Sequence, residues 1–69
     1  MKKITIILNG ERTGIPEGST VAELLDLAGA EGQRIAVVVN EAVIRPGDRS
    51  ATILKENDQV DLLVFAGGG

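Results

Sequence analysis

The chain has 69 residues, with seven basic and ten acidic side chains, a net charge of −3, and neither cysteine nor histidine. This length allows one domain that buries about 60% of the surface of its unfolded chain, which excludes an internal catalytic cleft, and the missing residue types exclude disulfides and the usual zinc sites. The hydrophobic fraction of 43% predicts a folded protein, and the acidic balance argues against nucleic-acid binding. A mildly acidic protein suits a partner with a basic surface, although surface charge often only confers solubility.

The first predicted element is a β-hairpin. Residues 3–8 are rich in β-branched side chains, and Asn9-Gly10 follows, a pair that suits a type I′ turn because both residues tolerate positive φ. The return strand is expected over residues 12–15, before Pro16 ends it. The opening apolar run is much shorter than a membrane span and lacks a signal-peptide cleavage pattern. We therefore expect no membrane association and a cytoplasmic location.

A short amphipathic helix is predicted next. Thr20 and Glu23 have the spacing of a capping box, in which each side chain accepts a hydrogen bond from a free backbone N–H at the start of the helix. Gly29 stands where helices commonly end in the left-handed conformation. The apolar residues between these signals recur at helical spacing: Val21, Leu24, Leu25 and Ala28.

The second half of the chain contains two further strong strand patterns. Residues 35–39 are strongly β-forming and end at the turn-prone Asn40, after which residues 42–44 can form a short partner strand. A turn is expected at residues 45–48, a single helical turn over residues 50–54, and the last strand over residues 58–65. The predicted order is strand, strand, helix, strand, short strand, strand.

Alternation along the strands separates a core face from an outer face. The core face is predicted to hold Ile4, Ile6, Leu8, Ile35, Val37, Val39, Val60, Leu62 and Val64. The outer face is predicted to hold Lys3, Thr5, Ile7, Ala36, Val38, Asp61, Leu63 and Phe65. We expect Ile7, Val38, Leu63 and Phe65 to form a docking patch for a partner. The alternative is that these are ordinary scattered apolar residues on a protein surface.

The C-terminal tail is the candidate functional segment. Residues 1–66 form the predicted domain, and Gly67, Gly68 and Gly69 form a slim tail that reaches roughly 10 Å beyond it. Without side chains these glycines can thread a narrow channel in another protein, where the α-carboxylate of Gly69 is the one reactive group. The glycines alone favour a frayed terminus. Their occurrence directly after a complete small domain, where the last predicted strand ends, reverses this preference and favours threading.

A carboxylate reacts with nucleophiles only after its oxygen becomes a leaving group, as in an acyl-adenylate. The sequence has no phosphate-binding loop and no histidine or cysteine for nucleophilic catalysis, so we expect a partner to activate the tail. We predict no catalytic residues, no metal site and no cofactor of the chain's own. Any sulfur carried would form a thiocarboxylate on Gly69, because the chain has no thiol.

Five segments resemble the ThiS family of sulfur carriers in thiamine biosynthesis, and together they cover essentially the whole chain. They are Leu-Asn-Gly-Glu, Gly-Ser-Thr-Val-Ala-Glu-Leu-Leu, Val-Val-Val-Asn-Glu, Leu-Lys-Glu-Asn-Asp-Gln-Val and the closing Phe-Ala-Gly-Gly-Gly. The resemblance implies an α+β protein with a ubiquitin-like β-grasp fold. In this fold a four- to five-stranded mixed sheet packs on one main helix, and a flexible glycine tail follows.

The resemblance also implies a cycle of reactions on the tail. An E1-like adenylyltransferase (ThiF-like) would use ATP and Mg to form an acyl-adenylate on Gly69. Sulfur from a donor such as a cysteine desulfurase would then replace AMP and leave a thiocarboxylate, and a thiazole synthase (ThiG-like) would accept that sulfur. In this cycle Gly67 and Gly68 form the threading arm.

One loop departs from the family pattern. Many such carriers have a Pro-Arg-Ser-x-x-Trp-like stretch where residues 45–50 here read Arg-Pro-Gly-Asp-Arg-Ser, and this chain has no tryptophan. The loop is a candidate partner contact, so the difference concerns the recipient enzyme more than the carrier chemistry. Two alternatives remain: a carrier like the small subunit of molybdopterin synthase, and a ubiquitin-like or TGS-like interaction module without tail chemistry.

Overall fold

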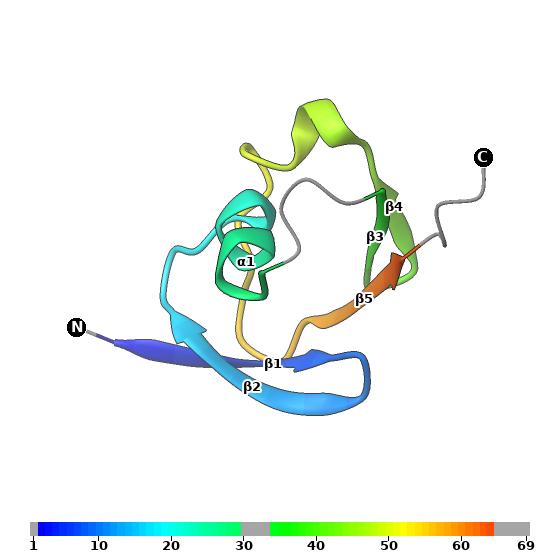
Figure 1. Ribbon diagram of the computed structural model, residues 1–69. Helices are drawn as coiled ribbons and strands as arrows, with labels where there is room; N and C mark the ends of the chain where they lie inside the picture. The colour runs from blue at the N-terminus through cyan, green and yellow to red at the C-terminus, as the bar shows by residue number, and fades with distance from the viewer. Residues whose placement is uncertain (1, 30–33, 65–69) are drawn as a thin grey trace.

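The protein forms a mixed β-sheet with one α-helix. The structure, a computed structural model, describes residues 2–29 and 34–64. In chain order its elements are β1 (Lys3–Leu8), β2 (Glu11–Pro16), α1 (Val21–Leu27), β3 (Ile35–Val39), β4 (Ala42–Ile44), the 3₁₀ helix η1 (Pro46–Asp48) and β5 (Gln59–Val64), as Figure 1 shows. This order agrees with the sequence-based prediction.

The strands lie in the order β2-β1-β5-β3-β4. β1 and β5 run parallel to each other, whereas β1–β2, β3–β5 and β3–β4 are antiparallel. The first and last strands of the chain are therefore neighbours, and β5 occupies the middle of the sheet. This arrangement is the mixed sheet that the resemblance implied.

Both hairpin turns use left-handed backbone conformations. Asn9 and Gly10 have φ values of 50° and 85°, as expected for the predicted type I′ turn. Asn40 and Glu41 form a second two-residue turn with φ values of 49° and 72°, and they join β3 to β4. The short partner strand is thereby confirmed. β2 is one residue longer at each end than predicted, and Pro16 occupies the last position of this edge strand, where proline is tolerated.

The capping box at the start of α1 is formed as predicted. The Glu23 N–H donates to Thr20 Oγ1 over 3.2 Å, and the Thr20 N–H donates to Glu23 Oε1 over 2.9 Å. At the other end, Gly29 has a φ of 71°, the left-handed conformation that ends the helix. Ala28 is exposed, contrary to the predicted apolar stripe, because it caps the helix instead of continuing its buried face.

The segment after η1 differs from the prediction. The single helical turn expected over residues 50–54 lies earlier, at η1, where Pro46 supplies the φ that a first turn requires. Residues 52–54 instead run beside the start of α1. The Val21 N–H donates to Thr52 O over 2.9 Å, and the Leu54 N–H donates to Ser19 O over 2.8 Å. The first N–H groups of a helix have no partner within it, so this extended segment satisfies one of them.

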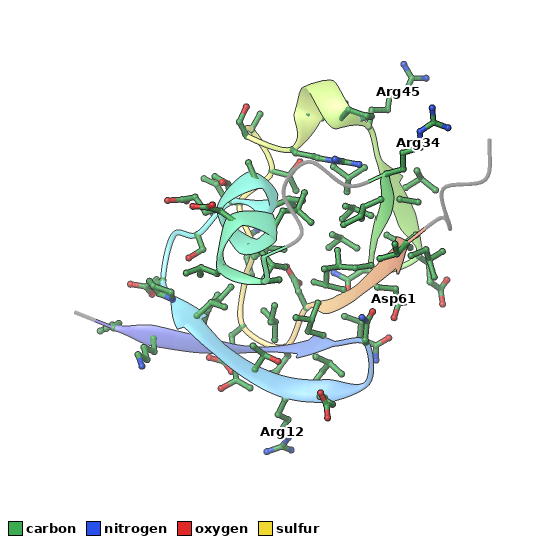
Figure 2. The ribbon with its side chains drawn as sticks, viewed as in Figure 1. Arg12, Arg34, Arg45 and Asp61 are labelled. Carbon is green, nitrogen blue, oxygen red and sulfur yellow. The ribbon has the colours of Figure 1, made fainter. Side chains whose placement is uncertain are left out.

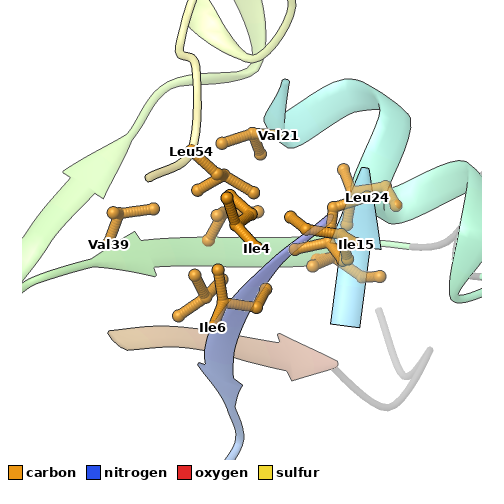
Figure 3. Close-up of a cluster of buried hydrophobic side chains, with 11 residues drawn as sticks. Ile4, Ile6, Ile15, Val21, Leu24, Val39 and Leu54 are labelled. Carbon is orange, nitrogen blue, oxygen red and sulfur yellow. The ribbon is translucent and has the colours of Figure 1, made fainter. Parts of the chain in front are cut away.

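The core lies between α1 and the sheet, as Figure 3 shows. Most of the predicted core residues are buried, and Leu8 and Leu62 pack against the cluster while half-buried. Val64 was predicted in the core but is 61% exposed. It lies at the last position of β5, where none of the described elements covers it. The buried cluster consists of Ile4, Ile6, Ile15, Val21, Leu24, Leu25, Ile35, Val37, Val39, Leu54 and Val60.

Candidate functional site

The candidate site is the end of the sheet from which the C-terminal segment continues. Val64, the last residue of β5, pairs with Ile35, the first residue of β3. Because β3 and β4 are antiparallel, the end of β4 lies at this same end of the sheet (Figure 1). The predicted tail residues Gly67, Gly68 and Gly69 and the predicted patch residue Phe65 lie outside the described residues. The structure therefore defines the end of β5 at Val64, after which residues 65–69 follow in the sequence.

Two turn asparagines hold β5 in register. Asn9, in the β1–β2 turn, accepts a hydrogen bond from the Leu62 N–H through Oδ1 over 2.8 Å, and its own N–H donates to Val60 O over 2.9 Å. Asn40, in the β3–β4 turn, accepts from the Gln59 N–H over 2.9 Å, and its N–H donates to Gln59 O over 2.8 Å. Each such bond contributes about 1 kcal/mol. These turns therefore fix the register of β5 relative to the rest of the sheet.

The start of β5 is fastened by a carboxylate. Asp58 accepts hydrogen bonds from the Lys55 N–H over 2.8 Å and from Asn40 Nδ2 over 3.0 Å. Its carbonyl oxygen accepts from the Ile7 N–H over 2.8 Å. The tight turn before β5 is thus joined both to β1 and to the β3–β4 turn. Because these hydrogen bonds hold the start of β5 in place, the residues that follow β5 leave the domain from a fixed position.

The outer face carries a group of apolar side chains near the tail. Val38 pairs with Asp61 on one side and with Val43 on the other, and Leu63 pairs with Ala36. Leu63 is 52% exposed and Val43 is 72% exposed. We call Ala36, Val38, Val43 and Leu63 the outer-face patch. Asp61 on β5 is not part of this patch but lies beside it, opposite Val38.

The strands that carry the predicted docking residues are neighbours, but the residues are not equally close. Val38 and Leu63 lie diagonally across adjacent strands. Ile7 is half-buried and pairs with Gln59 on the far side of β5, so Gln59 and Asp61 lie between it and Val38. The sequence-based set also lacked Val43. The two-residue turn at Asn40-Glu41 could have revealed it, because such a turn sets Val43 opposite Val38.

The described residues show no constellation for chemistry of their own. No group of three or more carboxylates among residues 2–29 and 34–64 could hold a metal ion. A hollow between the end of β2 and α1 is lined by seven residues, which include the acidic Glu17, Glu23 and Asp26 and the apolar Leu27. No helix in the described part of the chain is long and apolar enough to cross a membrane.

The sheet order, with parallel first and last strands at its centre and one helix on one face, defines a ubiquitin-like β-grasp protein. The chain belongs to the ThiS family, whose family model matches residues 3–69. The match includes the three terminal glycines. The fold and the family implied by the sequence resemblance are therefore confirmed.

Solved structures agree with this assignment. The crystal structure of the thiamine biosynthesis protein ThiS from Geobacter metallireducens is similar, with a TM-score of 0.80 and 32% identity over 96% of this chain and 100% of that chain. An NMR structure of a thiamine biosynthesis protein from the same organism has a TM-score of 0.78 and 30% identity, covering 96% of this chain and 88% of that one.

Two curated relatives differ in length. A thiazole synthase from Magnetococcus marinus is 39% identical over 64 residues, which are 93% of this chain and 20% of the thiazole synthase. The chain thus spans one fifth of that protein. The uncharacterized protein ycf40 of Porphyra purpurea is 28% identical over 68 residues, which cover 99% of this chain and 96% of that protein.

Proposed function

We propose that the protein is a sulfur carrier for thiamine biosynthesis and that the α-carboxylate of Gly69 carries the sulfur. The observation that supports this most is that the ThiS family match runs through residues 67–69 to Gly69, directly beyond the exposed end of β5. A peptide of glycines leaving a firmly fastened strand is suited to threading into a partner. The domain is the part that partner enzymes bind, and the tail carries the reactive group.

The proposed cycle needs enzymes that supply the chemistry. An E1-like adenylyltransferase binds ATP and Mg, and the Gly69 carboxylate attacks the α-phosphate to give an acyl-adenylate and pyrophosphate. A persulfide from a donor such as a cysteine desulfurase displaces AMP to give an acyl disulfide, and a thiol reductant then cleaves the S–S bond to leave a thiocarboxylate. The carrier contributes no catalytic side chain and no cofactor to these steps, and its role is that of a protein substrate in the cytoplasm.

A thiazole synthase is the proposed acceptor. This proposal is supported by the thiazole synthase in which a stretch covering one fifth of the protein is 39% identical to this chain. A carrier-like segment and an acceptor in one polypeptide are held at a high effective concentration, which favours transfer between them. The similarity to ThiS structures favours this acceptor over molybdopterin synthase.

Mass spectrometry after loading tests the proposed function. The full-length protein is incubated with an E1-like adenylyltransferase, Mg-ATP and a sulfur source, and is then treated with a thiol-directed alkylating reagent. Because the chain has no cysteine, we expect alkylation only in the C-terminal fragment, which identifies a thiocarboxylate on Gly69. An unmodified tail, under conditions that load a control carrier, would favour the interaction-module alternative.

The outer-face patch is the proposed docking surface. Replacement of Leu63 by aspartate is expected to raise the KM of the activating enzyme for the carrier about tenfold, since a tenfold change corresponds to roughly 1.4 kcal/mol of lost binding. The domain should stay folded, because Leu63 is already 52% exposed. Leu27→Asp on α1, at a site that is 64% exposed, is a control with the same change in charge. Equal KM values for the two variants would contradict a docking role for the patch.

A further inference from the structure

Two arginines lie at the end of the sheet where the tail begins. Arg34 directly precedes β3, and Arg45 directly follows β4. The antiparallel pairing of these strands brings both residues to the end marked by the Val64–Ile35 pair. Figure 2 shows both side chains projecting from this end, and both residues are exposed. The chain therefore presents two positive charges next to the start of its tail.

The two arginines also border the outer-face patch. Ile35, Val37 and Val39 are buried against α1, so the intervening positions on β3 belong to the outer face. By the same alternation Arg34 lies on the outer side of β3. Arg45, two residues beyond Val43, lies on the outer side of β4. The arginines thus continue the patch toward the tail, whereas Asp61 lies further from it.

A third arginine, Arg49, adds positive charge near Arg34 and Arg45, at the start of β3. Arg49 donates a hydrogen bond from Nη2 to Ile35 O, and its Nε is buried without a partner among the described residues. Its guanidinium is therefore held against the first residue of β3. Three of the four arginines in the chain gather at this end, although the net charge of the protein is −3.

We propose that Arg34 and Arg45 bind a carboxylate-rich rim around the mouth of the channel that receives the tail in the activating enzyme. This inference rests on the proposed function. A partner that admits the tail must face this end of the sheet, and its surface therefore meets the two arginines. Arginine forms bidentate contacts with carboxylates, and charge complementarity at an interface mainly raises the association rate and fixes orientation.

The length of the tail separates this proposal from a contact with nucleotide phosphate. Five residues follow Val64, and an extended chain of that length spans about 17 Å. A threaded tail would carry the Gly69 carboxylate, and the ATP that it attacks, well beyond the reach of an arginine side chain at the start of the tail. The arginines therefore face the entrance of the channel. The expectation of a basic partner surface, drawn from net charge alone, does not apply at this end.

Charge-reversal variants of the full-length carrier test the proposal. Arg34→Glu and Arg45→Glu are each compared with Lys55→Glu, which makes the same change in net charge in the turn before β5, at the opposite end of that strand from the tail. ATP–pyrophosphate exchange by an E1-like adenylyltransferase gives KM and kcat for each carrier. Thermal unfolding followed by circular dichroism shows that each variant is folded.

We expect Arg34→Glu and Arg45→Glu each to raise the KM for the carrier at least tenfold at low ionic strength, with little change in kcat. The difference should shrink as salt is added, because exposed charges are screened. Lys55→Glu should change KM less than twofold. Equal changes in all three variants would overturn the proposal, as would a loss in kcat at unchanged KM.

Two further outcomes separate the possible failures. A raised KM for ATP, with the KM for the carrier unchanged, would mean that the arginines contact the nucleotide and would overturn the carboxylate rim. If the unaltered carrier supports no exchange, the proposed function is contradicted, and so is the proposed contact of the arginines with a carboxylate-rich rim. If the unaltered carrier is active and the arginine variants behave like Lys55→Glu, only the rim is overturned.

Discussion

Removing Gly68 and Gly69 is expected to abolish adenylation and sulfur loading while leaving the free energy of unfolding unchanged. The deletion shortens the tail by about 7 Å, so the new terminal carboxylate on Gly67 can no longer reach the nucleotide in a channel built for the full tail. Glycine has no side chain to contribute to a core, so stability should not change. Pyrophosphate exchange and intact mass measure loading, and urea denaturation measures stability.

The truncated protein should still bind the activating enzyme, because the outer-face patch, Arg34 and Arg45 all remain. It is therefore expected to inhibit loading of the full-length carrier, with an inhibition constant near the KM of the carrier. An added alanine after Gly69 is a complementary variant, since it moves the carboxylate about 3.5 Å and should also prevent loading. Normal loading of the truncated chain would contradict the assignment of Gly69. The interaction-module alternative predicts that both variants keep full function.

Replacement of Leu54 by alanine is expected to lower the free energy of unfolding by about 2–5 kcal/mol. Leu54 is 2% exposed and belongs to the core cluster although it lies outside any strand or helix. The loss combines the transfer of apolar surface with the cavity left behind. For a domain of this size the total stability is only about 5 kcal/mol, so a loss near the upper end of this range would leave the variant partly unfolded at room temperature.

The neighbouring residue provides a matched control. Ile53 is 58% exposed, so Ile53→Ala should cost less than about 0.5 kcal/mol. Both variants remove a branched apolar side chain from the same extended segment, and urea denaturation monitored by circular dichroism compares them directly. Similar losses in the two variants would mean that the segment contributes through its backbone bonds to Ser19 and Val21 rather than through the Leu54 side chain.

The elements with local chemical signals could be predicted from the sequence. The Asn9-Gly10 turn and the Thr20–Glu23 capping box depend on residues within four positions of one another, and both form as expected. The alternation in β3 identified its buried side chains correctly, and the alternation in β1 did so for Ile4 and Ile6, whereas Leu8 is half-buried. Local propensity and burial agree at these positions.

The residues that could not be predicted depend on contacts between distant parts of the chain. Leu54 is buried because its segment bonds to the start of α1, more than thirty residues earlier in the sequence, and no periodic pattern marks such a position. Val64 fits the core alternation, but alternation cannot show where the cover of the helix ends. The position of the helical turn is an exception, because its cause is local. Pro46 has the φ that the first turn of a helix requires, so the helical turn forms at residues 46–48, which had been predicted to form a simple turn.

The candidate site was only partly accessible to sequence reasoning. The role of Gly69 followed from the composition of the tail and from the family resemblance, and it is still a proposal. The contact between Val38 and Val43 required the register of β3 and β4. The grouping of Arg34 and Arg45 required the knowledge that these strands meet at the end where β5 stops. Two charged residues that lie eleven positions apart carry no sequence signal of their proximity.

The central position of β5 has a consequence for synthesis of the protein. A ribosome makes β1 first and β5 last, yet these two strands pair side by side in the middle of the sheet. The nascent chain can form its two hairpins early, but the sheet stays divided until residues 59–64 emerge. Pairing over such a long sequence separation makes folding a late event. The fold thus completes only when the segment that leads into the tail has been translated. A folded domain that lacks β5, the strand that precedes the tail, is therefore not formed during synthesis.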